Sequence, residues 1–129
     1  MAAPAILLDT HALLWWATDA RSLSRTARRL IAHDDTTVVV SAATAWEIAT
    51  KVRLGKLTWR GGESIQAYCA GQRFELLPVS FTHAERAGSW PQPHGDPFDR
   101  LLAAQSAIED LPLVTNDPQL AAFGIQTIW

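Results

Sequence analysis

Acidic residues occur where a short apolar run or an irregular loop of this chain gives way to a helical pattern. Asp9 and Asp117 each follow an apolar run, and Asp96 and Asp99 open a long helical segment. Two carboxylates about 5 Å apart repel by roughly 3 kcal/mol at an effective dielectric near 20, so a convergent group must take up protons or bind a hard cation. Mg²⁺ or Mn²⁺ suits such oxygen ligands, and its bound water can become a nucleophile toward a phosphate.

Each of these acids also has a simpler explanation at the N-terminus of a helix. Asp96 and Asp117 directly precede prolines, which is typical of an N-cap residue followed by proline at the first helical position. Asp9 can cap the helix that follows it, and Asp99 suits the positive end of a helix dipole. Capping is the favoured explanation for Asp96. In general, however, a carboxylate that caps a helix through one oxygen still has a second oxygen that can bind a cation.

The elements that would position these acids are predicted from apolar runs and turn residues. Short apolar or β-branched runs predict strands at about 5–8, 36–40, 74–79, 111–115 and 125–128. Helical patterns follow Asp9 and cover about 25–31, 42–54, 63–70, 81–87, 97–109 and a short segment ending at Gly124. Such alternation favours an α/β fold with a mainly parallel sheet and helices on both faces. The carboxyl ends of parallel strands share one edge, so distant acids can converge there.

Glu47 lies in the helix predicted over 42–54, which ends at Gly55. The expected apolar face of that helix consists of Ala45, Ile48, Ala49 and Val52. Glu47 is next to this face, and its spacing from Lys51 also allows a surface ion pair, worth only about 0.3–0.5 kcal/mol. From its position alone, Glu47 has no assigned role.

Length and composition indicate one soluble domain over residues 1–129. Cys69 is the single cysteine, so neither an internal disulfide nor a cysteine-based zinc site can form. No apolar run approaches the roughly 18 residues of a membrane span, and we expect a cytoplasmic protein that does not enter the membrane. The net charge is −2, so a polyanionic substrate would need a local basic surface or a bound cation.

Six tryptophans are many for 129 residues. We expect that Trp15, Trp59 and Trp90 do not all lie in the core, and that exposed aromatic side chains mark a partner surface.

Other acidic α/β enzymes fit the spacing less well. A haloacid-dehalogenase phosphatase needs a second aspartate two residues after the first, where this chain has His11. A phosphoacceptor receiver domain needs paired acids and a late lysine, but Lys51 and Lys56 are both in mid-chain. A glycine-rich phosphate loop is also missing. His11 and His94 flank the acids, and we expect them to pack or form hydrogen bonds rather than bind metal.

Segments along nearly the whole chain resemble, in order, the PIN-domain ribonucleases of the VapC toxin type. The matching segments are Leu8-Asp9-Thr10-His11-Ala12-Leu13-Leu14-Trp15-Trp16, Ser41 with Ala45-Trp46-Glu47-Ile48 and Lys51, Gly55-Lys56-Leu57, His94-Gly95-Asp96-Pro97-Phe98-Asp99-Arg100-Leu101-Leu102-Ala103-Ala104-Gln105, and Thr115-Asn116-Asp117. One such segment would be weak support; together they are strong.

The resemblance implies a three-layer αβα PIN-like domain that acts as a Mg²⁺- or Mn²⁺-dependent endoribonuclease. It implies that Asp9, Glu47, Asp99 and Asp117 are the catalytic, metal-binding acids, with Thr115 and Asn116 as candidates for hydrogen bonds around them. The expected partners are an RNA substrate, a small antitoxin protein and a second copy of the chain in a homodimer. The alternative is a catalytically silent PIN-like module that binds RNA or protein.

Overall fold

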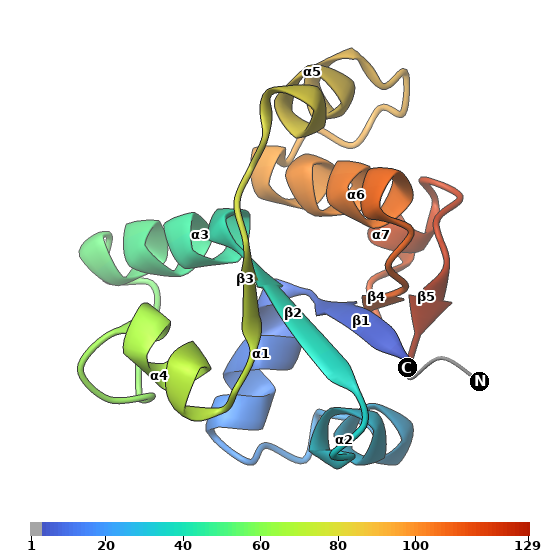
Figure 1. Cartoon of the computed structure of the whole chain (residues 1–129). Coiled ribbons are helices and arrows are strands. Elements are labelled where there is room, and N and C mark those ends of the chain that lie inside the picture. The colour runs from blue at the N-terminus through green and yellow to red at the C-terminus, as the bar shows by residue number, and fades with distance from the viewer. Residues whose placement is uncertain (1–3) are drawn as a thin grey trace.

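The computed structural model describes residues 4–129, which form a five-stranded parallel sheet flanked by helices (Figure 1). The strands are β1 (Ala5–Leu8), β2 (Thr37–Ser41), β3 (Glu75–Leu77), β4 (Leu113–Val114) and β5 (Thr127–Ile128). The helices are α1 (Thr10–Ala17), α2 (Arg25–Ala32), α3 (Ala42–Arg53), α4 (Ile65–Gly71), α5 (Phe81–Ser89), α6 (Pro97–Glu109) and α7 (Pro118–Ala121).

Two hydrophobic cores lie on opposite faces of the sheet. In β1, Ile6 and Leu8 belong to the core that packs beneath α1, α2 and α4, whereas Leu7 belongs to the core beneath α6 and α7. Successive side chains of a strand point to opposite faces, which explains this division. A strand buried on both faces reads as a continuous apolar run. The three-layer αβα architecture expected from the sequence is therefore confirmed (Figure 1).

The strand order places the centre of the sheet where the direction of winding reverses. The order is β3-β2-β1-β4-β5, so the chain moves outward from β1 to β3 and then returns to the other side of β1 with β4. In open α/β sheets the ligand crevice lies outside the carboxyl ends of the two strands at such a reversal. Here those ends are followed by Asp9 and Thr115.

The predicted strands are confirmed, and every strand pair in the described sheet is parallel. Three of them are shorter than predicted: 74–79 is reduced to Glu75–Leu77, 111–115 to Leu113–Val114 and 125–128 to Thr127–Ile128. β3 lies at the edge of the sheet and is followed directly by Pro78, which has no backbone N–H to donate to a neighbouring strand.

Two predictions about helices were wrong in detail. The buried side of α3 contains Ala43, Thr44, Glu47 and Ile48, while Ala49 and Val52 are exposed. Glu47 lies on this buried side and makes polar contacts there. The pattern of hydrophobic residues alone therefore predicted the wrong buried face of α3. The start of α4 is set by Ser64, whose hydroxyl accepts from the Ala67 amide, and the left-handed residue after the helix is Arg73, not Gly71.

As expected, Trp15, Trp59 and Trp90 do not all lie in the buried core. Trp15, Trp59 and Trp90 are partly buried and pack against the two cores, whereas Trp46 is 55% exposed and stands edge-on to Phe98. Within residues 4–129, no helix is long and apolar enough to span a bilayer.

Candidate functional site

Asp9 lies at the carboxyl end of the central strand and begins α1. Its Oδ1 accepts a hydrogen bond from the Ala12 amide at 2.7 Å, and its backbone amide bonds the carbonyl of Val114 in the neighbouring strand at 3.1 Å. The carboxylate is buried because the first turn of α1 and the end of β4 close over it. Asp9 is thus an N-cap, as the simpler explanation held, and it also stands at the reversal in winding.

Glu47 is held by two side chains from different elements. Oε1 accepts from the Thr10 hydroxyl at 2.5 Å, and Oε2 accepts from the Lys51 ammonium at 2.6 Å. The i,i+4 ion pair considered from the sequence therefore exists, but it is not a surface pair, because Glu47 is only 4% exposed. A buried carboxylate needs such partners, since ionisation without them would be costly.

Asp99 lies in the first turn of α6, and its Oδ2 is 2.8 Å from Nε2 of His94. His94 is held in place by Arg100, whose guanidinium donates to the carbonyls of Ala87, Trp90, Gln92 and His94. The Arg100 bonds fold the loop before α6 back over the start of that helix. His94 is thus a hydrogen-bonding residue, as expected.

Asp96 and Asp117 both act as helix caps. Oδ1 of Asp96 accepts from the amides of Phe98 and Asp99 at 2.9 and 3.0 Å, and Oδ1 of Asp117 accepts from the Gln119 amide at 2.9 Å. Capping by Asp96 was expected. Asp117 is linked to the centre of the sheet through Thr115, whose Oγ1 accepts from the Asp117 amide at 3.1 Å.

Electrostatic interactions link three of the acids. Burial raises the pKa of Asp9 above its ordinary value; hydrogen bonds from Thr115 and Ala12 oppose this rise, while the charge of Asp99 adds to it. Burial also raises the pKa of Asp99, against the hydrogen bond from His94 and together with the charges of Asp96 and Glu47. The hydrogen bond to Glu47 raises the pKa of Lys51. The charge of Asp99 thus acts on Asp9, and the charge of Glu47 acts on Asp99.

The oxygen donors of this group match what Mg²⁺ or Mn²⁺ prefers, and neither cysteine nor a cluster of histidines competes with them. Among residues 4–129, however, no three acidic, histidine or cysteine side chains converge closely enough to share one ion. Both carboxylate oxygens of Glu47 already accept hydrogen bonds, one from Thr10 and the other from Lys51. The residue types suit a divalent ion. To bind one, Glu47 would have to give up one of its present hydrogen bonds.

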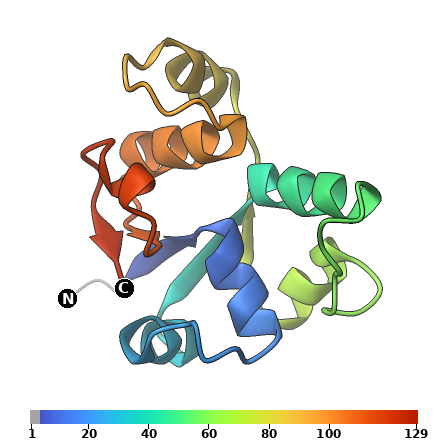
Figure 2. The ribbon, with the colours of Figure 1, turned by 180° about the vertical axis from the view of Figure 1, so that it is seen from behind.

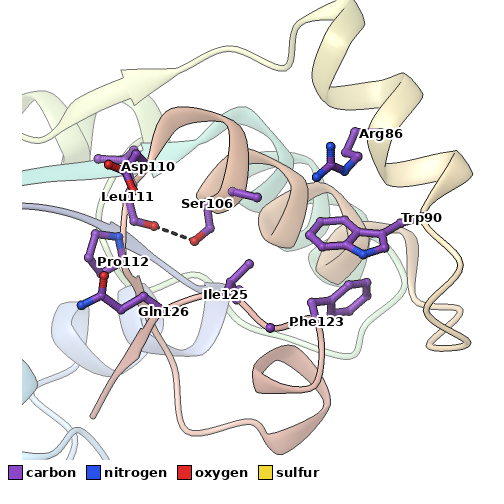
Figure 3. A pocket seen from close by; sticks show the side chains of 11 residues that line it. Arg86, Trp90, Ser106, Asp110, Leu111, Pro112, Phe123, Ile125 and Gln126 are labelled. Carbon is purple, nitrogen blue, oxygen red and sulfur yellow. Dashed lines mark hydrogen bonds between the residues drawn. The ribbon is translucent and has the colours of Figure 1, made fainter.

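A separate hollow of about 330 Å³ lies at the amino ends of β4 and β5 (Figure 3). Arg86, Trp90 and Phe123 line one part of it, and the Ser106 hydroxyl bonds the Leu111 carbonyl in another. None of the four predicted site acids lines this hollow. It lies at the opposite edge of the sheet from Asp9 and Thr115.

Three residues with direct contacts to the acids or to the loop beside them had no predicted role. Thr10 and Lys51 hold Glu47, and Arg100 holds the loop that carries His94. The i,i+4 spacing gave a signal for Lys51. Thr10 is 37 residues from its partner Glu47, and Arg100 is 6 to 13 residues from the carbonyls it binds. These contacts could not be predicted from residue spacing in the sequence.

Comparison with known proteins identifies the family. The PIN domain family model matches residues 6–125, whereas no curated protein matches the sequence. VapBC2 of Rickettsia felis, solved with a DNA fragment from its promoter, has a similar structure, with 15% identity, a TM-score of 0.67 and 97% of each chain covered.

Two further solved structures have the same fold. Mycobacterium tuberculosis VapC20, described as a Sarcin-Ricin loop cleaving toxin, is 15% identical, with a TM-score of 0.66 over 95% of this chain and 98% of that one. VapBC-1 of nontypeable Haemophilus influenzae is 18% identical, with a TM-score of 0.66 over 96% of both. This chain belongs to the PIN domain family, and its fold is that of VapC-type proteins.

Proposed function

We propose that this protein is a Mg²⁺- or Mn²⁺-dependent endoribonuclease and the toxin of a toxin–antitoxin pair. The observation that carries the proposal is the position of Asp9 at the reversal of strand order in a PIN domain, with the charge of Asp99 acting on Asp9 and that of Glu47 acting on Asp99. Repulsion among these acids favours a bound cation. Asp117 is the fourth acid of the proposed site, linked to Asp9 through Thr115.

Asp9, Asp99, Glu47 and Asp117 would hold the divalent ion. When bound, such an ion lowers the pKa of a water ligand and neutralises charge on a phosphate. Asp9 and Asp117 each use Oδ1 for a helix cap, so capping fixes the orientation of each carboxylate and leaves Oδ2 for the ion. His94 orients Asp99 in the same way through one oxygen.

The chain's own residues would then position RNA and exclude bulk water from the acids. Thr10 keeps Glu47 at the end of the sheet after Lys51 releases it, because the hydroxyl bonds a different oxygen from the ammonium. The released Lys51 would carry a positive charge beside the acids, where a phosphodiester must approach. Catalysis on this account comes mainly from positioning and charge neutralisation.

The proposed partners are a small antitoxin and a second copy of the chain. Similar folds have been solved as toxin–antitoxin complexes, including one from Klebsiella pneumoniae. Trp46 is 55% exposed and packs edge-on against Phe98, and an exposed aromatic pair suits a partner surface. Expression of the chain alone should stop growth, and co-expression with an adjacent small gene should restore it.

A catalytically silent binding module remains the second candidate. It is favoured by one observation: within residues 4–129, no three potential ligands are close enough to share an ion. Cleavage decides between the two functions. The purified protein should cut RNA with Mg²⁺ or Mn²⁺ and not in excess EDTA, while Asp9→Asn, purified identically, should not cut. RNA that stays intact with either metal, or is cut equally well in EDTA, would contradict the enzymatic proposal.

A further inference from the structure

A hollow of about 480 Å³ lies between α1 and the segment that follows α3. It begins at His11, two residues beyond Asp9, and extends along α1 as far as Thr18. In Figure 2, α1 lies toward the viewer and the chain that leaves α3 descends beside it. We call this hollow the Lys56 pocket; the residues that matter below are His11, Trp15, Lys56, Thr58 and Arg60.

One wall of the Lys56 pocket presents a polar side chain at every second position. Lys56, Thr58 and Arg60 are exposed and line the pocket, whereas Leu57 and Trp59 between them are partly buried against the core, with Leu57 also reaching the pocket lining. Opposite directions for successive side chains are typical of an extended chain. The side of this wall that faces the pocket therefore carries two cations and a hydroxyl, and the other side packs against the core.

The backbone of this wall is fixed at both ends. Gly55 has φ +73°, and the amides of Gly55 and Lys56 bond back to the last turn of α3 at 3.0 and 2.8 Å, which is a Schellman motif. At the other end, a Cβ on Gly61 would lie 2.2 Å from the Trp59 ring, so only glycine allows the chain to pass there. The backbone that carries Lys56 is thus held in place by the end of α3.

The facing wall is aromatic. The exposed ring of His11 lies 5.4 Å from the ring of Trp15, which is itself 5.7 Å from Trp129 in an edge-on contact. The inner rings are partly buried and hold His11 at the pocket mouth. An aromatic face beside a cationic groove is the arrangement that binds single-stranded nucleic acid by base stacking and backbone contact.

The charge of the Lys56 pocket is unbalanced. Lys56 and Arg60 form no ion pair among the residues the structure describes, and none of the described residues lining the pocket is acidic. By contrast, the hollow beside α2 pairs its Arg28 with Asp19. Free cations in a protein of net charge −2 give a local attraction for a polyanion.

We propose that the Lys56 pocket binds the single-stranded RNA adjoining the cut bond, with Lys56 and Arg60 on phosphates and His11 stacked against one base. The inference rests on the proposed ribonuclease function and extends it, because it places a substrate subsite outside the four acids and names α1 as the direction in which the strand leaves them. A duplex keeps its bases stacked within itself and offers none to His11. An apolar protein segment fits less well, since Lys56 and Arg60 have no acidic partner in the described lining and a polyanion would neutralise both.

The test uses full-length protein carrying Asp99→Asn, in EDTA, so that binding is measured without cleavage. A fluorescently labelled single-stranded oligoribonucleotide of mixed sequence is titrated by anisotropy at several salt concentrations. Adding Lys56→Gln with Arg60→Gln should weaken binding by about tenfold and reduce the slope of log K against log salt by about 1.4, at about 0.7 for each lost phosphate contact. The control, Arg25→Gln with Arg29→Gln on exposed α2, removes the same net charge and should change neither quantity comparably.

Two further variants test the aromatic wall. His11→Ala should weaken binding of single-stranded RNA without changing the salt slope, and His11→Phe should preserve it, because phenylalanine keeps the stacking face. Circular dichroism melts verify that all variants fold. Equal loss of affinity in the pocket and control pairs, or equal affinity of the parent for duplex and single-stranded RNA, would overturn the inference.

Failure of the inference can be told from failure of the proposed function. If wild type cuts RNA with Mg²⁺ while the pocket variants bind as the Asp99→Asn parent does, the function stands and the subsite is wrong. If the pocket variants bind RNA normally but no longer bind the product of the adjacent small gene, the pocket is a protein-docking site. If wild type neither binds nor cuts RNA, both proposals fall.

Discussion

The ammonium of Lys51 lies 2.6 Å from Oε2 of Glu47, a carboxylate that is only 4% exposed. This contact neutralises a buried acid within the metal-free protein, and any divalent ion that uses Glu47 must displace it. In the proposed site, Lys51 and the ion would therefore compete for the same oxygen. The competition makes the affinity for metal depend on a residue that is not itself a ligand.

Replacement of Lys51 by Met should separate these two effects. Without the ammonium, Glu47 keeps only the Thr10 hydroxyl, so the metal-free variant should lose about 1–2 kcal/mol of stability; this is below the 3–5 kcal/mol of a fully buried pair because the Lys51 side chain is 38% exposed. Mn²⁺ should then bind more tightly than to wild type. Thermal melts in EDTA and calorimetric Mn²⁺ titrations measure both, and weaker Mn²⁺ binding by the variant would refute the competition.

Thr10 should stabilise the protein through its hydroxyl rather than its shape. Thr10→Val keeps the volume but removes the donor to Oε1 of Glu47, and hydrogen bonds to charged groups are worth about 1.5–3 kcal/mol. Thr10→Ser keeps the donor and should lose less. Urea denaturation of both variants in EDTA provides the comparison; a Val variant at least as stable as the Ser variant would show that the hydrogen bond contributes little.

Arg100 should be irreplaceable by lysine because its guanidinium bonds four carbonyls at once. An ammonium cannot reach all of them, so Arg100→Lys should lose at least about 2 kcal/mol, the scale of one or two charge-assisted bonds. Limited proteolysis should also cut faster between residues 90 and 95. Arg29→Lys on the exposed side of α2 is the control. Equal stability of the two variants would mean that the four hydrogen bonds of the Arg100 guanidinium are not needed to hold the loop.

The raised pKa values of Asp9 and Asp99 predict an unusual pH dependence. Because the folded state takes up protons at higher pH than the unfolded chain, ionisation of these groups costs stability at neutral pH, and the cost is removed as pH falls through the raised pKa values toward 3.8. In EDTA, wild type should therefore gain stability on mild acidification relative to a variant with Asp9→Asn and Asp99→Asn. Denaturant titrations at several pH values would measure the free energy of unfolding of both proteins. A difference between the two proteins that does not change with pH would contradict this prediction.

Sequence reasoning located the parts of the fold that depend on local chemistry. The strand before Asp9 is a continuous apolar run, and the cap at Asp96 followed by Pro97 marks the start of α6, so both were predictable. The orientation of α3 was not, because it depends on a bond from Thr10, 37 residues away in sequence, to Glu47. For the same reason Glu47 entered the candidate site through family resemblance and not through its own surroundings.

In the proposed site, Asp99 belongs to a metal-binding group of acids and does more than favour the start of α6. If it served only the helix dipole, Asp99→Asn would destabilise the protein by about 0.3–1 kcal/mol with or without magnesium. In a repelling group of acids, the substitution relieves a larger cost, so the stability of the variant in EDTA should equal or exceed that of wild type.

The most direct measurement is a set of melting curves for wild type and Asp99→Asn in EDTA and at increasing Mg²⁺ concentrations. Ligand linkage predicts that wild type is stabilised in proportion to the logarithm of one plus the ratio of metal concentration to Kd. The account predicts this rise for wild type and a much smaller one for the variant. A variant that is less stable in EDTA, and that gains as much from Mg²⁺ as wild type does, would make Asp99 a helix-stabilising residue and contradict the proposed site.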